Sequence, residues 1–180
     1  YINWRKDAKL LTDKDKKHLD FLTYQRIITR LHKLDKQLKG VGGLVVFAKK
    51  HKEKANLIVD KVLRFRQHRY NIHGKHLLYM DLDGFLHIYL RHVEELNTNG
   101  LYPQKTKFQL NEQDVETVIS NVMSSLNDEY QEFREIYPNR QFRKYDEEAY
   151  YYKGDYYVLR VETDGRLTQF YKLDIRNRIE

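Results

Sequence analysis

The sequence has no cysteine, two prolines, eight glycines and a single tryptophan among 180 residues. Without cysteine, the chain has no disulfide scaffold and no thiolate for zinc binding or nucleophilic chemistry. No apolar run approaches the roughly 18 residues that a membrane-spanning helix needs, and no secretory signal pattern is present. We therefore expect a globular domain with no membrane partner. Because the sequence opens on Tyr1 rather than Met, we expect it to be part of a larger polypeptide or a processed product.

Tyrosine and basic residues are abundant instead. The chain has 15 Tyr and 8 Phe, and tyrosine suits both a half-solvated sheet and a nucleic-acid surface. The net charge of +7 is unevenly spread: residues 1–70 hold 19 Lys/Arg against 7 Asp/Glu, and residues 71–180 hold 14 against 19. This asymmetry favours one face for a polyanion. An ordinary solvated helix surface would have the same composition.

Helical periodicity dominates the first part of the chain. The apolar spacing predicts a helix over residues 12–39 and a second helix that ends near Arg66. The glycine-rich segment 39–43 lacks the spacing of a phosphate-binding loop, so we interpret it as a hinge. Residues 44–48, LVVFA, fit a buried helix or a short strand. The clearest helix is 111–136, with Asn111 as its cap, one apolar stripe and an acidic outer face.

Strand patterns follow in two places. Apolar runs at 76–80 and 86–92 flank an Asp-Gly dipeptide, which predicts a β-hairpin. Within its second strand, His87 and Arg91 would share one face and His92 the other. The segments QFRKY, AYYYK, DYYVLRVE and RLTQFYKL between residues 141 and 173 predict an antiparallel meander.

Together these patterns predict an α+β fold. N-terminal helices precede a small antiparallel β-sheet with one long amphipathic helix packed on it. We place an N-terminal helical segment at residues 1–43 and an α+β domain at residues 44–180.

A cluster of cations and imidazoles indicates a possible chemistry. Between Lys61 and Met80 the chain has five Lys/Arg and three His, with no Asp or Glu. Cleavage of RNA without a metal needs a base for the 2′-OH, an acid for the leaving oxygen and cations for the phosphorane. Histidine suits the first two roles, and Arg or Lys suits the third. His92 is the leading candidate, and His87 is its alternate.

Two further motifs point the same way. Residues 87–92, HIYLRH, and 165–172, GRLTQFYK, follow a basic helical lead-in and lie within a small-sheet layout. Over residues 44–175 this arrangement resembles the metal-independent ribonuclease superfamily of barnase, EndoU, colicin nucleases and RelE-type toxins. The resemblance is nearest to the toxin domains at the C-termini of contact-dependent inhibition proteins and phage proteins.

The resemblance implies a toxin or effector domain that cleaves RNA, tRNA or another structured RNA, through a 2′,3′-cyclic phosphate. It implies no metal or cofactor, a cognate acidic immunity or antitoxin protein, and action in the cytoplasm of a target cell. In many such toxins a Thr precedes the aromatic pair of the last strand. Here Gln169 has that place, and Thr168 stands one residue earlier, on the other face of a regular strand.

The candidate residues fall into two groups. Those for catalysis are His92, His87, Arg91, His76, Tyr171 and Thr168. Those for RNA binding are Arg64, Arg66, His68, Arg69, His73, Lys75, Arg160, Arg166 and Lys172.

Three alternatives stay open. His73 and His76, with His87 or His92, form a possible three-histidine zinc site, although the His-Glu-x-x-His motif is absent. A non-enzymatic RNA- or DNA-binding module, for example of a phage particle, would show salt-dependent affinity without a product. A structural protein would dock its basic front half on an acidic partner.

Overall fold

The computed structural model describes residues 21–70, 72–92 and 112–173. The fold is α+β, as predicted, and the chain divides between Phe65 and Arg66 into two compact units. In the described part of the chain, no helix is long and apolar enough to cross a membrane.

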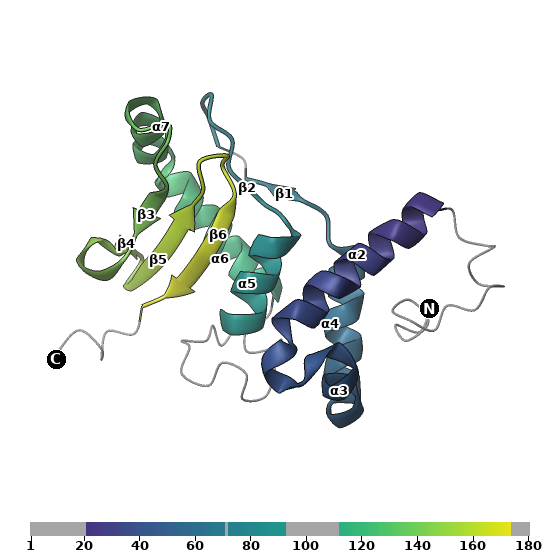
Figure 1. Ribbon diagram of the computed structural model, residues 1–180. Helices are drawn as coiled ribbons and strands as arrows, with labels where there is room; N and C mark the ends of the chain where they lie inside the picture. Colours follow the sequence, from purple (N-terminus) through teal and green to yellow (C-terminus); the bar gives the residue numbers. More distant parts are fainter. Residues whose placement is uncertain (1–20, 71, 93–111, 174–180) are drawn as a thin grey trace. The chain divides into compact units, whose positions relative to one another are not determined.

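The first unit is helical. It contains α2 (Phe21–Gln37), the 3₁₀ turn η2 (Lys39–Val41), α3 (Gly43–Lys50) and α4 (Lys52–Arg64) (Figure 1). The predicted helix over 12–39 corresponds to α2, and its expected beginning lies outside the described residues. The predicted hinge is η2, which ends on Gly42 in the left-handed region at φ 93°. The segment LVVFA, which the sequence left open, lies in α3.

The first unit extends past the boundary that we expected at residue 43. Leu34, Phe47 and Val62, from α2, α3 and α4, are each at most 1% exposed. The Asp35 carboxylate also accepts a hydrogen bond from the Leu44 backbone N–H at 2.8 Å, which ties α2 to the start of α3. Because these helices share one apolar core, the unit ends at Phe65.

The second unit contains a four-stranded antiparallel sheet. Its strands are β3 (Phe142–Lys144), β4 (Tyr150–Tyr152), β5 (Asp155–Val161) and β6 (Leu167–Lys172). β6 pairs with one edge of β5. β3 and β4 pair with different parts of β5, separated by the 3₁₀ turn η4 (Asp146–Glu148). The four predicted strands are all present.

The helices α6 (Glu112–Ser125) and α7 (Asn127–Ile136) cover one face of this sheet (Figure 1). The Phe142 ring packs on the rings of Tyr130 and Phe133. The sequence predicted one helix over 111–136, but it is interrupted at Leu126. There the Ser125 hydroxyl donates to the Val122 carbonyl at 2.9 Å, a local bond that commonly bends helices. The expected cap, Asn111, lies outside the described residues.

The predicted hairpin over 76–92 is wrong. Residues Leu82–His92 form the helix α5, and β2 (Tyr79–Met80) pairs with β1 (His68–Arg69). The Asp81 carboxylate accepts a hydrogen bond from the Gly84 N–H at 2.9 Å, so Asp81 caps a helix instead of opening a turn. A short run that is apolar on all sides fits a buried helix as well as a buried strand, and the cap decides between them.

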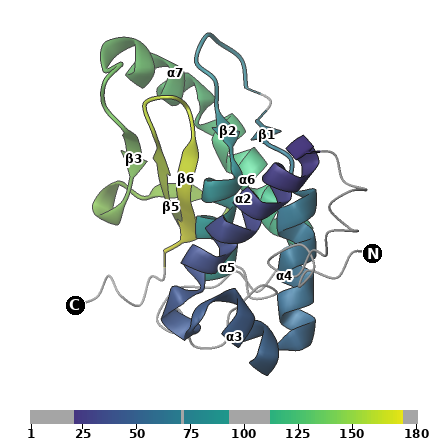
Figure 2. The same cartoon turned by 45° about the vertical axis from the view of Figure 1, so that its right-hand side comes forward.

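Helix α5 lies alongside β6 (Figures 1 and 2). A Cβ atom added at Gly84 would lie 2.4 Å from the Leu167 carbonyl oxygen. The helix therefore reaches the β6 backbone because residue 84 has no side chain. At the same end of β6, the Tyr79 N–H donates to the Gly165 carbonyl at 3.0 Å.

Candidate functional site

Strand alternation defines two faces of the sheet. Phe142 pairs with Val161 and Leu159 pairs with Phe170, and these residues lie on the face that α6 and α7 cover. Their neighbours along each strand point the other way. We call this second side the polar face. Its residues include Arg143, Tyr151, Tyr156, Arg160, Glu162, Thr168, Gln169 and Tyr171, and the buried Val158 lies between Tyr156 and Arg160.

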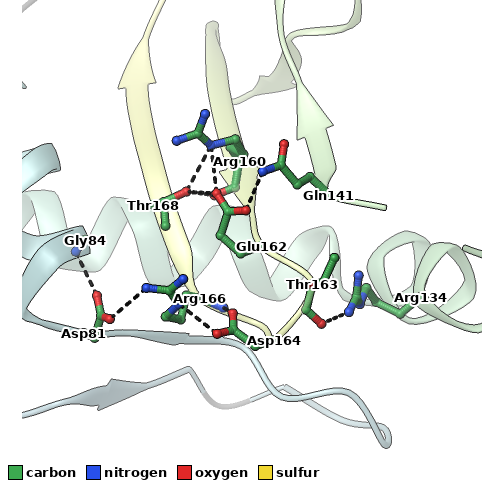
Figure 3. A network of polar contacts seen from close by, with 10 residues as sticks. All are labelled: Asp81, Gly84, Arg134, Gln141, Arg160, Glu162, Thr163, Asp164, Arg166 and Thr168. Atoms are coloured by element: carbon green, nitrogen blue, oxygen red, sulfur yellow. Dashed lines mark hydrogen bonds and ion pairs between the residues drawn. The ribbon is translucent and has the colours of Figure 1, made fainter. Parts of the chain in front are cut away.

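A hydrogen-bonded network lies on the polar face (Figure 3). The Thr168 hydroxyl donates to the Glu162 carboxylate at 2.9 Å, and the Arg160 Nε atom lies 3.1 Å from the same oxygen. Arg160 Nε also lies 3.1 Å from the Thr168 hydroxyl. The Gln141 amide donates to the second carboxylate oxygen of Glu162. The result is a carboxylate and a guanidinium held in fixed positions on a sheet.

The sequence prediction missed Glu162. The signal was present, because Arg160 and Glu162 are two residues apart in a predicted strand and such residues share a face.

A bulge in β6 brings Thr168 into this network. Arg160 pairs with Gln169, and the next residue of β5, Val161, pairs with Leu167, so Thr168 is an extra residue on β6. A bulge redirects side chains in this way. In a regular strand Thr168 would point to the opposite face. The bulge turns its side chain to the face that holds Arg160 and Glu162.

Tyr171 and His92 lie together at the edge of the polar face. Their rings are stacked, with centroids 4.7 Å apart and planes at 12°. His92 is only 3% exposed, whereas Tyr171 is partly exposed. Burial, and then the charge of Asp146, raises the pKa of Tyr171 above its ordinary value. The phenol is protonated at neutral pH, as an ordinary tyrosine also is, and can donate a hydrogen bond.

His87 and Arg91 form a pair on α5. Arg91 Nη1 lies 3.5 Å from His87 Nε2, and both side chains are partly buried. Gly84 and His92 both contact β6, Gly84 at the Leu167 carbonyl and His92 at the Tyr171 ring. Arg91 of this pair is the sequence neighbour of His92.

His76 is placed elsewhere. It lies in the loop between β1 and β2, which runs along α7 and not along a facing strand. Its backbone N–H donates to the Gln131 side chain at 3.0 Å, and its ring lies 3.1 Å from Glu135. Lys75 also lies 3.1 Å from Glu135, and the Asn127 amide donates to the His73 carbonyl at 2.8 Å. Because α7 covers the opposite face of the sheet, this group is separate from the polar face.

Most of the predicted RNA-binding cations pair with carboxylates of the same chain. Arg166 lies 2.8 Å from Asp164 and 3.4 Å from Asp81 (Figure 3). Burial acts to lower the pKa of Arg166, but the two carboxylates outweigh it and raise the value. The other pairs are Arg64–Asp60, His68–Glu116, Lys75–Glu135, Arg160–Glu162 and Lys172–Asp155. Arg66, Arg69 and His73 are exposed.

His68 belongs to a second polar cluster. The Glu116 carboxylate lies 3.2 Å from His68 and accepts a hydrogen bond from the Tyr89 hydroxyl at 2.7 Å. Burial, and then the Glu116 charge, raises the pKa of Tyr70 well above its usual value. These contacts join β1, α5 and α6, so His68 has a structural role in this unit.

No metal site is formed by the described residues, among which no three His, Asp or Glu side chains group closely enough to hold an ion. The His76 ring contacts Glu135 of α7 and the His87 ring lies beside Arg91 of α5, so these two histidines do not form the three-histidine arrangement.

Comparisons of the chain with models of known protein families, with characterised proteins and with solved structures gave no significant match. The resemblance to ribonuclease toxins therefore stays a prediction from the sequence.

Proposed function

We propose that this chain is a metal-independent endoribonuclease whose active site is the network on the polar face. The observation that carries the proposal is the fixed Glu162–Arg160–Thr168 group, with a protonated Tyr171 on the same face. These are a carboxylate base, a cation and a proton donor, which are the groups that transesterification of RNA needs.

Each group has a defined part in the reaction. Glu162 takes the proton from the ribose 2′-OH as its oxygen forms a bond to phosphorus. Arg160 neutralises the negative charge that develops on the phosphorane. The bond from phosphorus to the 5′ oxygen breaks, and Tyr171 gives its proton to that oxygen. The products are a 2′,3′-cyclic phosphate and a 5′-hydroxyl.

This assignment changes the role of His92. A general base must reach the proton that it takes, and the His92 ring is buried behind Tyr171. We assign His92 as a positioning residue that holds the Tyr171 ring.

The test is incubation of the purified protein with RNA in excess EDTA. The wild type is expected to give fragments that end in a cyclic phosphate. Glu162→Gln keeps the shape of the side chain but removes the base, so cleavage should fall by about 10²- to 10⁴-fold. Glu147→Gln, an exposed change in η4, is the matched control. Unchanged cleavage by the Glu162→Gln variant would show that this network is not the active site.

A non-enzymatic RNA-binding module is the second candidate. It is favoured by the tyrosines that share the polar face with Arg143. If the chain is such a module, the wild type and the Glu162→Gln variant should both retard RNA on a gel, and neither should cleave it.

The proposal extends to partners. A toxin domain of this type would be inhibited by an acidic protein that covers the polar face. Mixing the enzyme with such a protein would protect RNA from cleavage.

A further inference from the structure

Two tyrosines stand side by side at one end of the polar face. Tyr151 on β4 pairs with Tyr156 on β5, and their ring centroids are 5.2 Å apart at an interplanar angle of 57°. Tyr151 is 58% exposed. Its neighbour Tyr150 points the other way, because the Tyr150 hydroxyl lies 3.0 Å from the Ser125 hydroxyl of α6.

The aromatic side chains continue across the sheet. Val158 pairs with Tyr171 and the Leu173 N–H donates to the Tyr156 carbonyl at 2.8 Å, so Tyr156 and Tyr171 are diagonal neighbours on adjacent strands. Tyr171 in turn stacks on His92. We call this series the aromatic band: Tyr151, Tyr156, Tyr171 and His92.

An exposed cation, Arg143, lies on the same face of the sheet as the aromatic band. Arg143 pairs with Arg160 in the sheet register, is exposed, and hydrogen-bonds to the neutral Gln141 side chain instead of a carboxylate. Cationic side chains together with exposed aromatic rings are the means by which proteins hold single-stranded nucleic acid.

We propose that the aromatic band is a binding subsite for unpaired RNA bases, with Tyr151 and Tyr156 as the stacking platform. Base planes inside a duplex are covered by their neighbours, so only splayed-out bases of a single strand or loop can stack on a side chain. From Tyr156 to Arg160 is four residues of strand, or about 13 Å. An extended stretch of unpaired RNA can span that distance from the platform to the network. This inference rests on the proposed function for the bond that is cut, but base binding itself needs no cleavage.

The exposed tyrosines would also suit a protein interface. The exposed Arg143, which bonds to a neutral amide, favours a polyanion instead, and the experiment tests this choice.

The experiment measures binding to a fluorescent single-stranded 2′-O-methyl oligoribonucleotide by anisotropy. This probe lacks the nucleophilic hydroxyl and cannot be cleaved. Tyr151→Ala should weaken binding by about 5- to 150-fold, the usual effect of losing one base-stacking ring, and Tyr151→Trp should restore it. Tyr137→Ala removes a comparably exposed tyrosine at the end of α7, and binding should be unchanged. A duplex of the same sequence should bind more weakly and should not respond to Tyr151→Ala.

Binding that is unaffected by Tyr151→Ala would overturn the inference, and so would a duplex that binds as tightly as the single strand. Failure of the proposed function looks different. If Tyr151→Ala weakens binding but no RNA is cut by the wild type, the subsite stands and the ribonuclease assignment fails. If cleavage depends on Glu162 but Tyr151→Ala does not change binding, the ribonuclease assignment stands and the base-binding subsite fails.

Discussion

At the scale of single residues, the missing side chain of Gly84 determines how closely α5 packs against β6. It allows α5 to approach the β6 backbone, which in turn places His92 against Tyr171. The atom that an added Cβ would meet is a backbone oxygen, which has no rotamer by which to move away.

Gly84→Ala should therefore destabilise the protein, although alanine is the better helix former. Overpacking costs about 1–3 kcal/mol, which exceeds the gain of up to about 1 kcal/mol from helix propensity. The free energy of unfolding by urea measures the balance. Ser124→Ala, an exposed helical change, serves as the control and should be neutral or slightly stabilising. A more stable Gly84→Ala variant would mean that α5 does not lie so close to β6.

The contribution of Glu135 to the free energy of unfolding should depend on pH. Hydrogen bonds from Lys75, then from His76, lower the pKa of Glu135 below its usual value of 4.5. A depressed carboxyl pKa stabilises the folded state above the unfolded-state pKa, and this stability is lost as the pH falls through the folded-state pKa. The stability difference between the wild type and Glu135→Gln should thus be present at neutral pH and shrink below pH 4.5. Urea titrations across this range, with Glu132→Gln as the exposed control, measure it; a difference that grows in acid would contradict it.

At the scale of elements, Asp81 determines what the following eleven residues become. Its carboxylate caps α5 through the Gly84 N–H and reaches Arg166 at 3.4 Å from the turn between β5 and β6. One side chain thus starts a helix and ties it to the sheet.

Two variants of Asp81 separate these effects. Asp81→Ala removes the cap and the ion pair and should cost about 1–2 kcal/mol. Asp81→Asn keeps a capping oxygen and loses only a partly exposed ion pair, so it should cost less than about 1 kcal/mol. Urea unfolding of both variants gives the comparison. Equal losses would show that the cap contributes little.

The same element shows where sequence reasoning succeeds and fails. The four strands from 142 to 172 were predictable, because alternation and turn residues agree there. The run from Leu82 to His92 was not, because it is apolar on every side and its cap resembles a turn. For the site, Arg160, Thr168 and Tyr171 were named from the sequence and do share one face. Their partner Glu162 was not, and the bulge that aligns Thr168 depends on pairing between strands.

At the scale of the whole molecule, the net charge of +7 overstates the charge that is free to meet RNA. The cations of the sheet and of the β1–β2 loop that were predicted to bind RNA mostly face carboxylates of the same chain. Arg143 is the exposed cation beside the network.

Binding of single-stranded RNA should consequently depend weakly on salt. Each phosphate contact contributes a slope of about −0.7 in a plot of log affinity against log salt. A slope between about −0.7 and −2 is expected, which corresponds to one to three contacts. Anisotropy with the uncleavable oligonucleotide between about 50 and 200 mM salt measures it. A slope steeper than about −5 would show that the basic first 70 residues also bind the RNA backbone.

The interruption between β3 and β4 has a practical consequence. Both strands take their register from β5, while Asp146, Glu147 and Glu148 form an exposed turn between them. The number of residues in that turn is therefore not set by either pairing. A short peptide tag or a reporter group inserted there would leave the hydrogen bonds of both strands in place. It would provide an attachment point for immobilising the protein or for labelling it near the aromatic band.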